Sequence, residues 1–170
     1  MEIVIRKIDR ADLPRLGAWR YPEPYAMYTV SADGFAGFLD PDLRYHLALD
    51  GEGVIVGYCC FGRDARVPGG RYPGDLPAVV DIGLGLEPAL TGAGLGAVFL
   101  SAILSFAADT FAVVRFRATV AQFNQRSIRT FTKRGFEVTH RFERPPDGLP
   151  FVQVERLAVQ SPGSPVASLI

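Results

Sequence analysis

Residues 80–107 read VDIGLGLEPALTGAGLGAVFLSAILSFA, and the organisation of the chain follows from this stretch. An apolar strand pattern leads through a glycine-rich turn at residues 92–96 directly into a long helical pattern. A helix N-terminus approached by glycines leaves several backbone N–H groups unpaired, which suits a phosphate group. The sequence therefore predicts a pyrophosphate-binding turn between a strand and a helix.

The two elements on either side of this turn have different periodicities. Apolar residues recur at i, i+3, i+4 and i+7 spacing over residues 95–108, which predicts a helix with one broad apolar face packed against a sheet. Over residues 79–86, alternation predicts a strand with two unlike faces. One face carries Asp81, Gly83, Gly85 and then Glu87, and the other carries only apolar side chains.

Length and composition favour one globular domain. The chain has 170 residues, of which 48% are hydrophobic and 21% charged, and its formal net charge is zero. Lys and Arg are spread along the chain, so the basic patch of a nucleic-acid-binding protein is missing. No run approaches the roughly 20 apolar residues that a membrane span needs, and the first residues lack a signal-peptide stretch.

The two cysteines, Cys59 and Cys60, are adjacent within an apolar strand pattern. Neighbouring side chains on a strand point to opposite faces, so we do not expect these two to pair. Reduced core thiols fit a cytoplasmic protein, and no spacing in the sequence resembles a metal site.

The remaining pattern adds further elements around the central stretch. Strands are expected at residues 2–8, 43–50, 54–61, 79–86, 111–120, 136–143 and 151–159, and helices at 12–21, 31–39, 95–108 and 124–134. Asn124 is the expected cap of the last helix and Gly135 its end. Residues 63–77, rich in Gly, Pro, Arg and Asp, are expected to form a long exposed loop.

Two segments together resemble a known family. The run DIGLGLEP at 81–88, followed by LTGAGLG at 90–96, resembles the acyl-CoA-binding motif of the GNAT superfamily of N-acyltransferases. The run NQRSIRTF at 124–131, followed by KRGF at 133–136, resembles the family's other signature, an Asn-initiated helix closed by Gly-Phe. Both occur in the element order of that family, and the resemblance covers residues 2–158.

The resemblance implies a fold and an activity. The fold is α/β (α+β), a single domain whose mixed, mostly antiparallel sheet is flanked by helices on both faces. Residues 1–159 would form this domain and residues 160–170 a flexible tail. The activity is transfer of an acetyl group from acetyl-CoA to a primary amine of a small molecule or peptide, by direct attack in a ternary complex and without a metal.

The resemblance also implies where the cofactor lies. Its arm would run along the glycine face of strand 79–86, in a wedge where the fourth and fifth strands splay apart. The backbone of the turn would hold the pyrophosphate, and Asn124 would contact the arm. The expected cofactor-binding residues are Ile82, Gly83, Leu84, Gly85, Leu86, Gly92, Ala93, Gly94, Leu95, Gly96, Ala97, Asn124 and Phe131.

The sequence departs from the family pattern at two positions. Thr91 stands where Gln or Arg is usual, which a binding site built from backbone groups tolerates. Phe131 stands where a tyrosine commonly protonates the departing thiolate, so water or another residue must serve, or the chain binds acyl-CoA without turnover. Asp81, on the glycine face, is the first candidate for the general base that removes the proton of the amine.

Other interpretations remain open at this point. A non-catalytic acyl-CoA-binding module fits Phe131, whereas a dinucleotide-dependent oxidoreductase fits only the turn, because the surrounding strands form hairpins instead of repeated βαβ units. Three tyrosines, Tyr21, Tyr25 and Tyr28, either pack against the first helix or border the acceptor pocket. Three arginines, Arg63, Arg66 and Arg71, are expected to be solvated, with contact to an acidic substrate or a cofactor phosphate as the alternative. Acceptor specificity would lie in loops 21–30 and 63–77, and a homodimer is compatible with the pattern.

Overall fold

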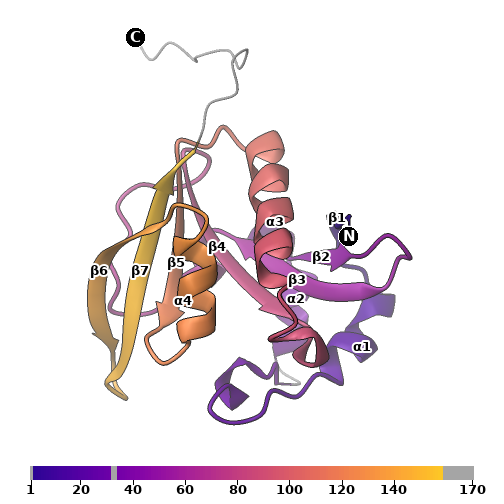
Figure 1. Cartoon of the computed structure of the whole chain (residues 1–170). Coiled ribbons are helices and arrows are strands. Elements are labelled where there is room, and N and C mark those ends of the chain that lie inside the picture. The colour runs from indigo at the N-terminus through magenta and orange to yellow at the C-terminus, as the bar shows by residue number, and fades with distance from the viewer. Residues whose placement is uncertain (1, 32–33, 159–170) are drawn as a thin grey trace.

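The computed structural model describes residues 2–31 and 34–158, which form one twisted seven-stranded sheet with helices packed against it (Figure 1). The expected C-terminal tail, residues 160–170, lies outside the described residues. The strands are β1 (Val4–Lys7), β2 (His46–Leu49), β3 (Ile55–Phe61), β4 (Val79–Leu86), β5 (Arg115–Ala121), β6 (Glu137–Arg144) and β7 (Leu149–Leu157). The main helices are α1 (Leu13–Gly17), α2 (Phe35–Phe38), α3 (Gly96–Thr110) and α4 (Gln125–Thr132).

The strands follow the order β1-β2-β3-β4-β5-β7-β6. Every neighbouring pair is antiparallel except β4 and β5, which run parallel. The mixed, mostly antiparallel sheet is thus confirmed. A doubly wound dinucleotide-binding sheet is mostly parallel, whereas only one pair is parallel here, so that interpretation is wrong.

Two apolar cores hold the helices on opposite faces of the sheet. The larger core joins α3 and α4 to β4, β5 and β7, and includes Phe99, Ile103 and Phe131, all buried. The smaller core joins α1 and α2 to β2 and β3, and includes Leu16 and Phe38. The helix pair α3 and α4 lies in front of the sheet in Figure 1.

The boundaries of α3 differ from the predicted ones. The helix continues to Thr110, and the N–H group of Phe111 donates to the carbonyl of Ala107 to close its last turn. Strand β5 therefore begins at Arg115, not at residue 111 as the apolar run suggested. An aromatic residue that caps a helix and one that opens a strand look alike in sequence.

The N-terminal half also has shorter elements than expected. Helix α1 ends at Gly17, which packs against the ring of Phe35. A Cβ at this position would lie only 2.7 Å from Cζ of Phe35. Strand β2 begins at His46, not at residue 43, because Pro41–Leu43 forms a 3₁₀ turn and Arg44 adopts a left-handed conformation with φ 51°. Close packing and a single turn residue override local periodicity here.

Strands β4 and β5 stay together only at their beginning. Their parallel pairing covers Val79–Asp81 against Arg115–Arg117 and stops there. Beyond that point β4 pairs with β3 through Leu86, and β5 pairs with β7 through Ala121. The two strands therefore diverge from Ile82 onward, and the divergence opens toward the N-terminus of α3.

Candidate functional site

A cavity of about 550 Å³ occupies the divergence between β4 and β5. Its volume lies within the range usual for small-molecule sites. Residues from β4, the glycine-rich turn, β5, α4 and the segment between α1 and α2 line it. They include Tyr21, Tyr25, Tyr28, Tyr58, Ile82, Gly83, Leu84, Gly85, Leu86, Thr91, Gly92, Gly94, Gly96, Ala97, Phe99, Ala118, Thr119, Val120, Asn124, Arg126, Ser127, Arg129, Thr130, Phe131 and Lys133.

The glycine-rich turn contributes backbone to this cavity. Gly92 and Gly94 have positive φ angles of 84° and 80°, which allow the chain to turn back into α3 within a few residues. No side chain caps the N-terminus of α3, so the amides of its first turn are available to an anion. Gly96 approaches α4 closely, since a Cβ there would lie 3.2 Å from Oγ1 of Thr130.

Helix α4 forms the opposite wall. Asn124 caps it, because its Oδ1 accepts from the N–H of Ser127 at 3.1 Å, while its Nδ2 donates to the hydroxyl of Tyr28 at 3.4 Å. The helix also presents the cations Arg126, Arg129 and Lys133 to the cavity. These cations and the amides of the turn together form a positive surface suited to phosphate groups.

Most of the sequence-predicted cofactor residues meet in this one cavity. All of them line it except Ala93 and Leu95, whose side chains belong to the turn but not to the lining. Phe131 lines it as well. Its ring is 2% exposed and packs edge-on against Phe136 at 5.0 Å between centroids, so a core role and a place at the cavity coexist.

The glycine face of β4 is more crowded than predicted. A Cβ on Gly83 would lie 2.6 Å from Sγ of Cys60, and one on Gly85 would lie 2.6 Å from the Tyr58 ring. Both neighbours stand directly across the β3–β4 ladder. The glycines therefore also make room for side chains of β3. Because Gly85 has no side chain, the Tyr58 ring can reach the cavity.

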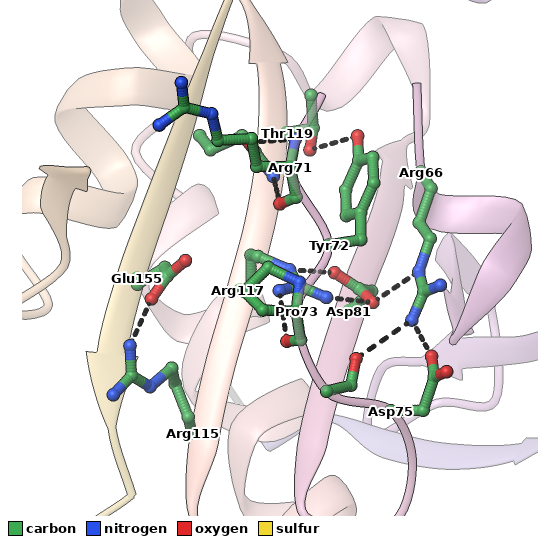
Figure 2. A network of polar contacts seen from close by, with 12 residues as sticks. Arg66, Arg71, Tyr72, Pro73, Asp75, Asp81, Arg115, Arg117, Thr119 and Glu155 are labelled. Atoms are coloured by element: carbon green, nitrogen blue, oxygen red, sulfur yellow. Dashed lines mark hydrogen bonds and ion pairs between the residues drawn. The ribbon is translucent and has the colours of Figure 1, made fainter. Parts of the chain in front are cut away.

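Asp81 lies in a buried ion-pair network instead of in the cavity lining (Figure 2). Its carboxylate accepts from Nη2 and Nε of Arg117, the former at 2.8 Å, and from Nε of Arg66 at 2.8 Å. Asp81 and Arg117 are each 1% exposed. Both carboxylate oxygens are thus held by guanidinium groups, a geometry that favours a structural ion pair over the predicted general base.

The same network draws loop 63–77 onto the sheet (Figure 2). The ring of Tyr72 lies under the guanidinium groups of Arg66 and Arg117, at 5.2 and 5.0 Å, and its hydroxyl contacts Oγ1 of Thr119. The backbone of Arg71 exchanges two hydrogen bonds with the buried amide of Gln153. The expectation that Arg66 is solvated is therefore wrong.

Several cavity residues were not predicted from the sequence. Tyr58 reaches the cavity only because it stands opposite a glycine, which the sequence does not reveal. Arg126, Arg129 and Lys133 recur at i, i+3 and i+7, so the helical periodicity that predicted α4 could also have placed them on one face. Burial raises the pKa of the Tyr58 hydroxyl, so the ring is neutral in the cavity.

The two cysteines are poor candidates for a catalytic nucleophile. Cys59 and Cys60 are free and buried, and burial raises the pKa of the Cys60 thiol to about 12. A thiol so hard to ionise is a poor nucleophile.

Within residues 2–31 and 34–158, no group of three or more His, Cys, Asp or Glu side chains could hold a metal ion. No helix in these ranges is both long and apolar enough to cross a membrane.

Comparison with known families agrees with this geometry. Residues 2–137 match the acetyltransferase (GNAT) domain. The chain belongs to the GNAT family of acetyltransferases. Comparison with curated protein sequences found no significant match.

Solved GNAT structures share the fold at low sequence identity. An aminoglycoside acetyltransferase in complex with coenzyme A superposes with a TM-score of 0.74 at 21% identity, covering 92% of this chain and 95% of that chain. A GNAT-family acetyltransferase from Bacillus anthracis gives 0.72 at 17%, with the same coverage. The yncA protein from Salmonella typhimurium, with acetyl-CoA, gives 0.64 at 23%, covering 99% and 100%.

Proposed function

We propose that this GNAT acetyltransferase transfers the acetyl group of acetyl-CoA to the primary amine of a small molecule. One observation carries the proposal: a single cavity joins the uncapped N-terminus of α3 to the gap between β4 and β5. The amides of the turn and the cations of α4 would hold the pyrophosphate. The thioester end would reach the gap, where backbone groups of β4 no longer pair with β5.

The reaction would proceed by direct attack. The amine lone pair forms a bond to the thioester carbonyl carbon, the C–S bond breaks, the amine loses a proton and the CoA thiolate gains one. The atoms balance without a covalent enzyme intermediate, in agreement with the buried and protonated Cys59 and Cys60.

We assign both proton transfers, from the amine and to the thiolate, to water. Phe131 carries no proton to donate, and the carboxylate of Asp81 is held by Arg66 and Arg117. We therefore propose Asp81 as the residue that fixes the start of the strand divergence, with water accepting the amine proton and supplying the proton of the thiol. Asn124 would position the cofactor arm from the start of α4.

Two measurements test the proposal. Calorimetry with CoA should show binding, and thiol release from acetyl-CoA should depend on an added amine. Tight CoA binding with no amine-dependent thiol release on any amine would favour a non-catalytic acyl-CoA-binding module. Binding of NAD without binding of CoA would contradict the proposal entirely.

A further inference from the structure

The acceptor side of the cavity is aromatic. Four tyrosines line it, Tyr21, Tyr25 and Tyr28 from the segment between α1 and α2, and Tyr58 from β3. In Figure 1 that segment passes beneath the gap between β4 and β5 and beside the start of α4. We call these four residues the tyrosine chamber.

Neighbouring aromatic rings hold the chamber in place. Phe123 packs against Tyr25 at 5.7 Å and against Tyr28 at 6.2 Å between ring centroids, and Trp19 stacks on Tyr58 at 6.1 Å. The chamber is therefore built before any ligand arrives, and its rings lose little freedom on binding.

Two of the hydroxyl groups in the chamber are already engaged. The hydroxyl of Tyr21 donates to the carbonyl of Leu86 at 2.6 Å, and that of Tyr28 accepts from Asn124. What these tyrosines offer an acceptor is chiefly ring surface. Ring surface favours a flat apolar group, through stacking.

The charges in the cavity disfavour a polycationic acceptor. Among its described lining residues there is no carboxylate, and its cations, Arg126, Arg129 and Lys133, would be neutralised by the phosphates of the cofactor. Glu87, the acid that follows β4, lies outside the lining and pairs with Arg15 at 3.7 Å. A second or third ammonium group would have to give up its water without an anionic partner.

The same environment favours the reactive form of the amine. An apolar chamber without a carboxylate desolvates a protonated amine and therefore lowers its pKa. The amine can then lose its proton to water before attack, without a carboxylate base. This arrangement suits a monoamine and suits a polycation poorly.

We infer that the acceptor is a compact primary monoamine with an aromatic or other flat apolar body, and not an aminoglycoside or polyamine. The inference rests on the proposed function, because it names the acceptor class for that same cavity. It also separates this chain from the aminoglycoside acetyltransferase whose fold it shares.

An amine panel tests the inference. Thiol release from acetyl-CoA is measured with 2-phenylethylamine and tryptamine on one side, and with kanamycin and spermidine on the other. We expect kcat/KM to be about tenfold or more higher for the aromatic monoamines, the effect of one or two ring contacts and the missing carboxylate. Preference for kanamycin or spermidine would overturn the acceptor class and leave the transferase proposal intact. CoA binding without release on any amine would overturn the transferase proposal itself.

Variants show whether the chamber causes the preference. Tyr58→Leu should lower kcat/KM for 2-phenylethylamine about fivefold relative to kcat/KM for spermidine, because one ring contact is lost. Phe142→Leu is the matched control, since this half-buried ring packs on Phe151 outside the cavity. If Tyr58→Leu unfolds, Tyr28→Leu supplies the comparison between amines, with CoA affinity measured in parallel because Tyr28 also accepts from Asn124. An unchanged kcat/KM in a folded chamber variant would overturn the inference.

Discussion

Arg117 holds the carboxylate of Asp81 at the last residue pair that joins β4 to β5. The two strands separate immediately after this pair, and the cavity begins where they separate. The ion pair thus fastens the narrow end of the site. Arg66 adds a second guanidinium from loop 63–77, so the loop and both strands meet on one carboxylate.

Asp81→Asn should strongly destabilise the fold. Removing one partner of a buried ion pair leaves an uncompensated charge, which costs about 3–5 kcal/mol in the free energy of unfolding. Urea unfolding measures this loss, and Asp42→Asn, at an exposed position, is the control. If the variant stays folded, the shape of its kcat–pH profile should not change. Loss of a limb of that profile would instead show that Asp81 is the base.

Gly94→Ala should separate turn strain from cofactor binding. Gly94 and Gly53 have φ angles of 80° and 78°, and a Cβ at either position would meet nothing within 4 Å. Both alanine variants should therefore lose a similar free energy of unfolding, about 1–2 kcal/mol. Only Gly94→Ala should weaken CoA binding in calorimetry. Equal CoA affinity in the two variants would argue against a phosphate site at the turn.

Arg126→Ala should weaken CoA binding about tenfold, the effect expected when one charge-assisted phosphate contact is lost. The guanidinium of Arg126 lines the cavity and stacks 4.2 Å above the Tyr25 ring. Arg141→Ala, at an exposed position on β6, controls for the loss of a positive charge. The measurement is the dissociation constant for CoA of the two variants, determined by calorimetry at fixed ionic strength. Equal values for the two variants would contradict a phosphate contact at Arg126.

Phe131→Tyr should raise kcat. The ring of Phe131 lines the cavity, so a hydroxyl there could protonate the departing thiolate, a task otherwise left to water. Steady-state thiol release at saturating acetyl-CoA is the measurement, and thermal unfolding checks that the packing on Phe136 survives. An unchanged kcat in a folded variant would mean that protonation of the thiolate does not limit the rate.

Stability should fall in alkaline solution. Burial raises the pKa values of Cys59, Cys60 and Tyr58 in the folded state, whereas unfolded Cys and Tyr have pKa values of about 8.5 and 10. The unfolded state thus releases protons first, so stability is complete below about pH 8 and declines as the pH rises beyond these unfolded values. Urea midpoints between neutral pH and about pH 10 test this. In the Cys60→Ala variant, the urea midpoint should fall less over this pH range than in the unchanged protein.

Sequence patterns predicted the features of the site that depend on neighbouring residues in the chain. The periodicity of α3 and the glycines before it predicted a helix start that faces the cavity, and Asn124 was correctly placed as the cap of α4. These features depend on residues a few positions apart. The separation of β4 from β5 was expected from the family resemblance alone, because no local pattern encodes which strands separate.

Long-range contacts account for what the sequence did not predict. Arg66 and Arg117 lie 15 and 36 residues from Asp81, and their sequence surroundings do not differ from those of solvated arginines. Tyr58 and Gly85 likewise meet only through the register of β3 and β4. A carboxylate that seemed available in the sequence is thus held in the fold, and a tyrosine that seemed ordinary reaches the site.

The position of β7 in the sheet affects how the protein folds during synthesis. This last strand lies between β5 and β6, and it supplies the long ladder of β5, whose pairing with β4 spans only three residue pairs. On the ribosome, the β5 wall of the cavity would therefore lack its support until residues 149–157 emerge. Until then, β5 presents an open edge to other chains, which makes the nascent protein most prone to aggregation late in synthesis.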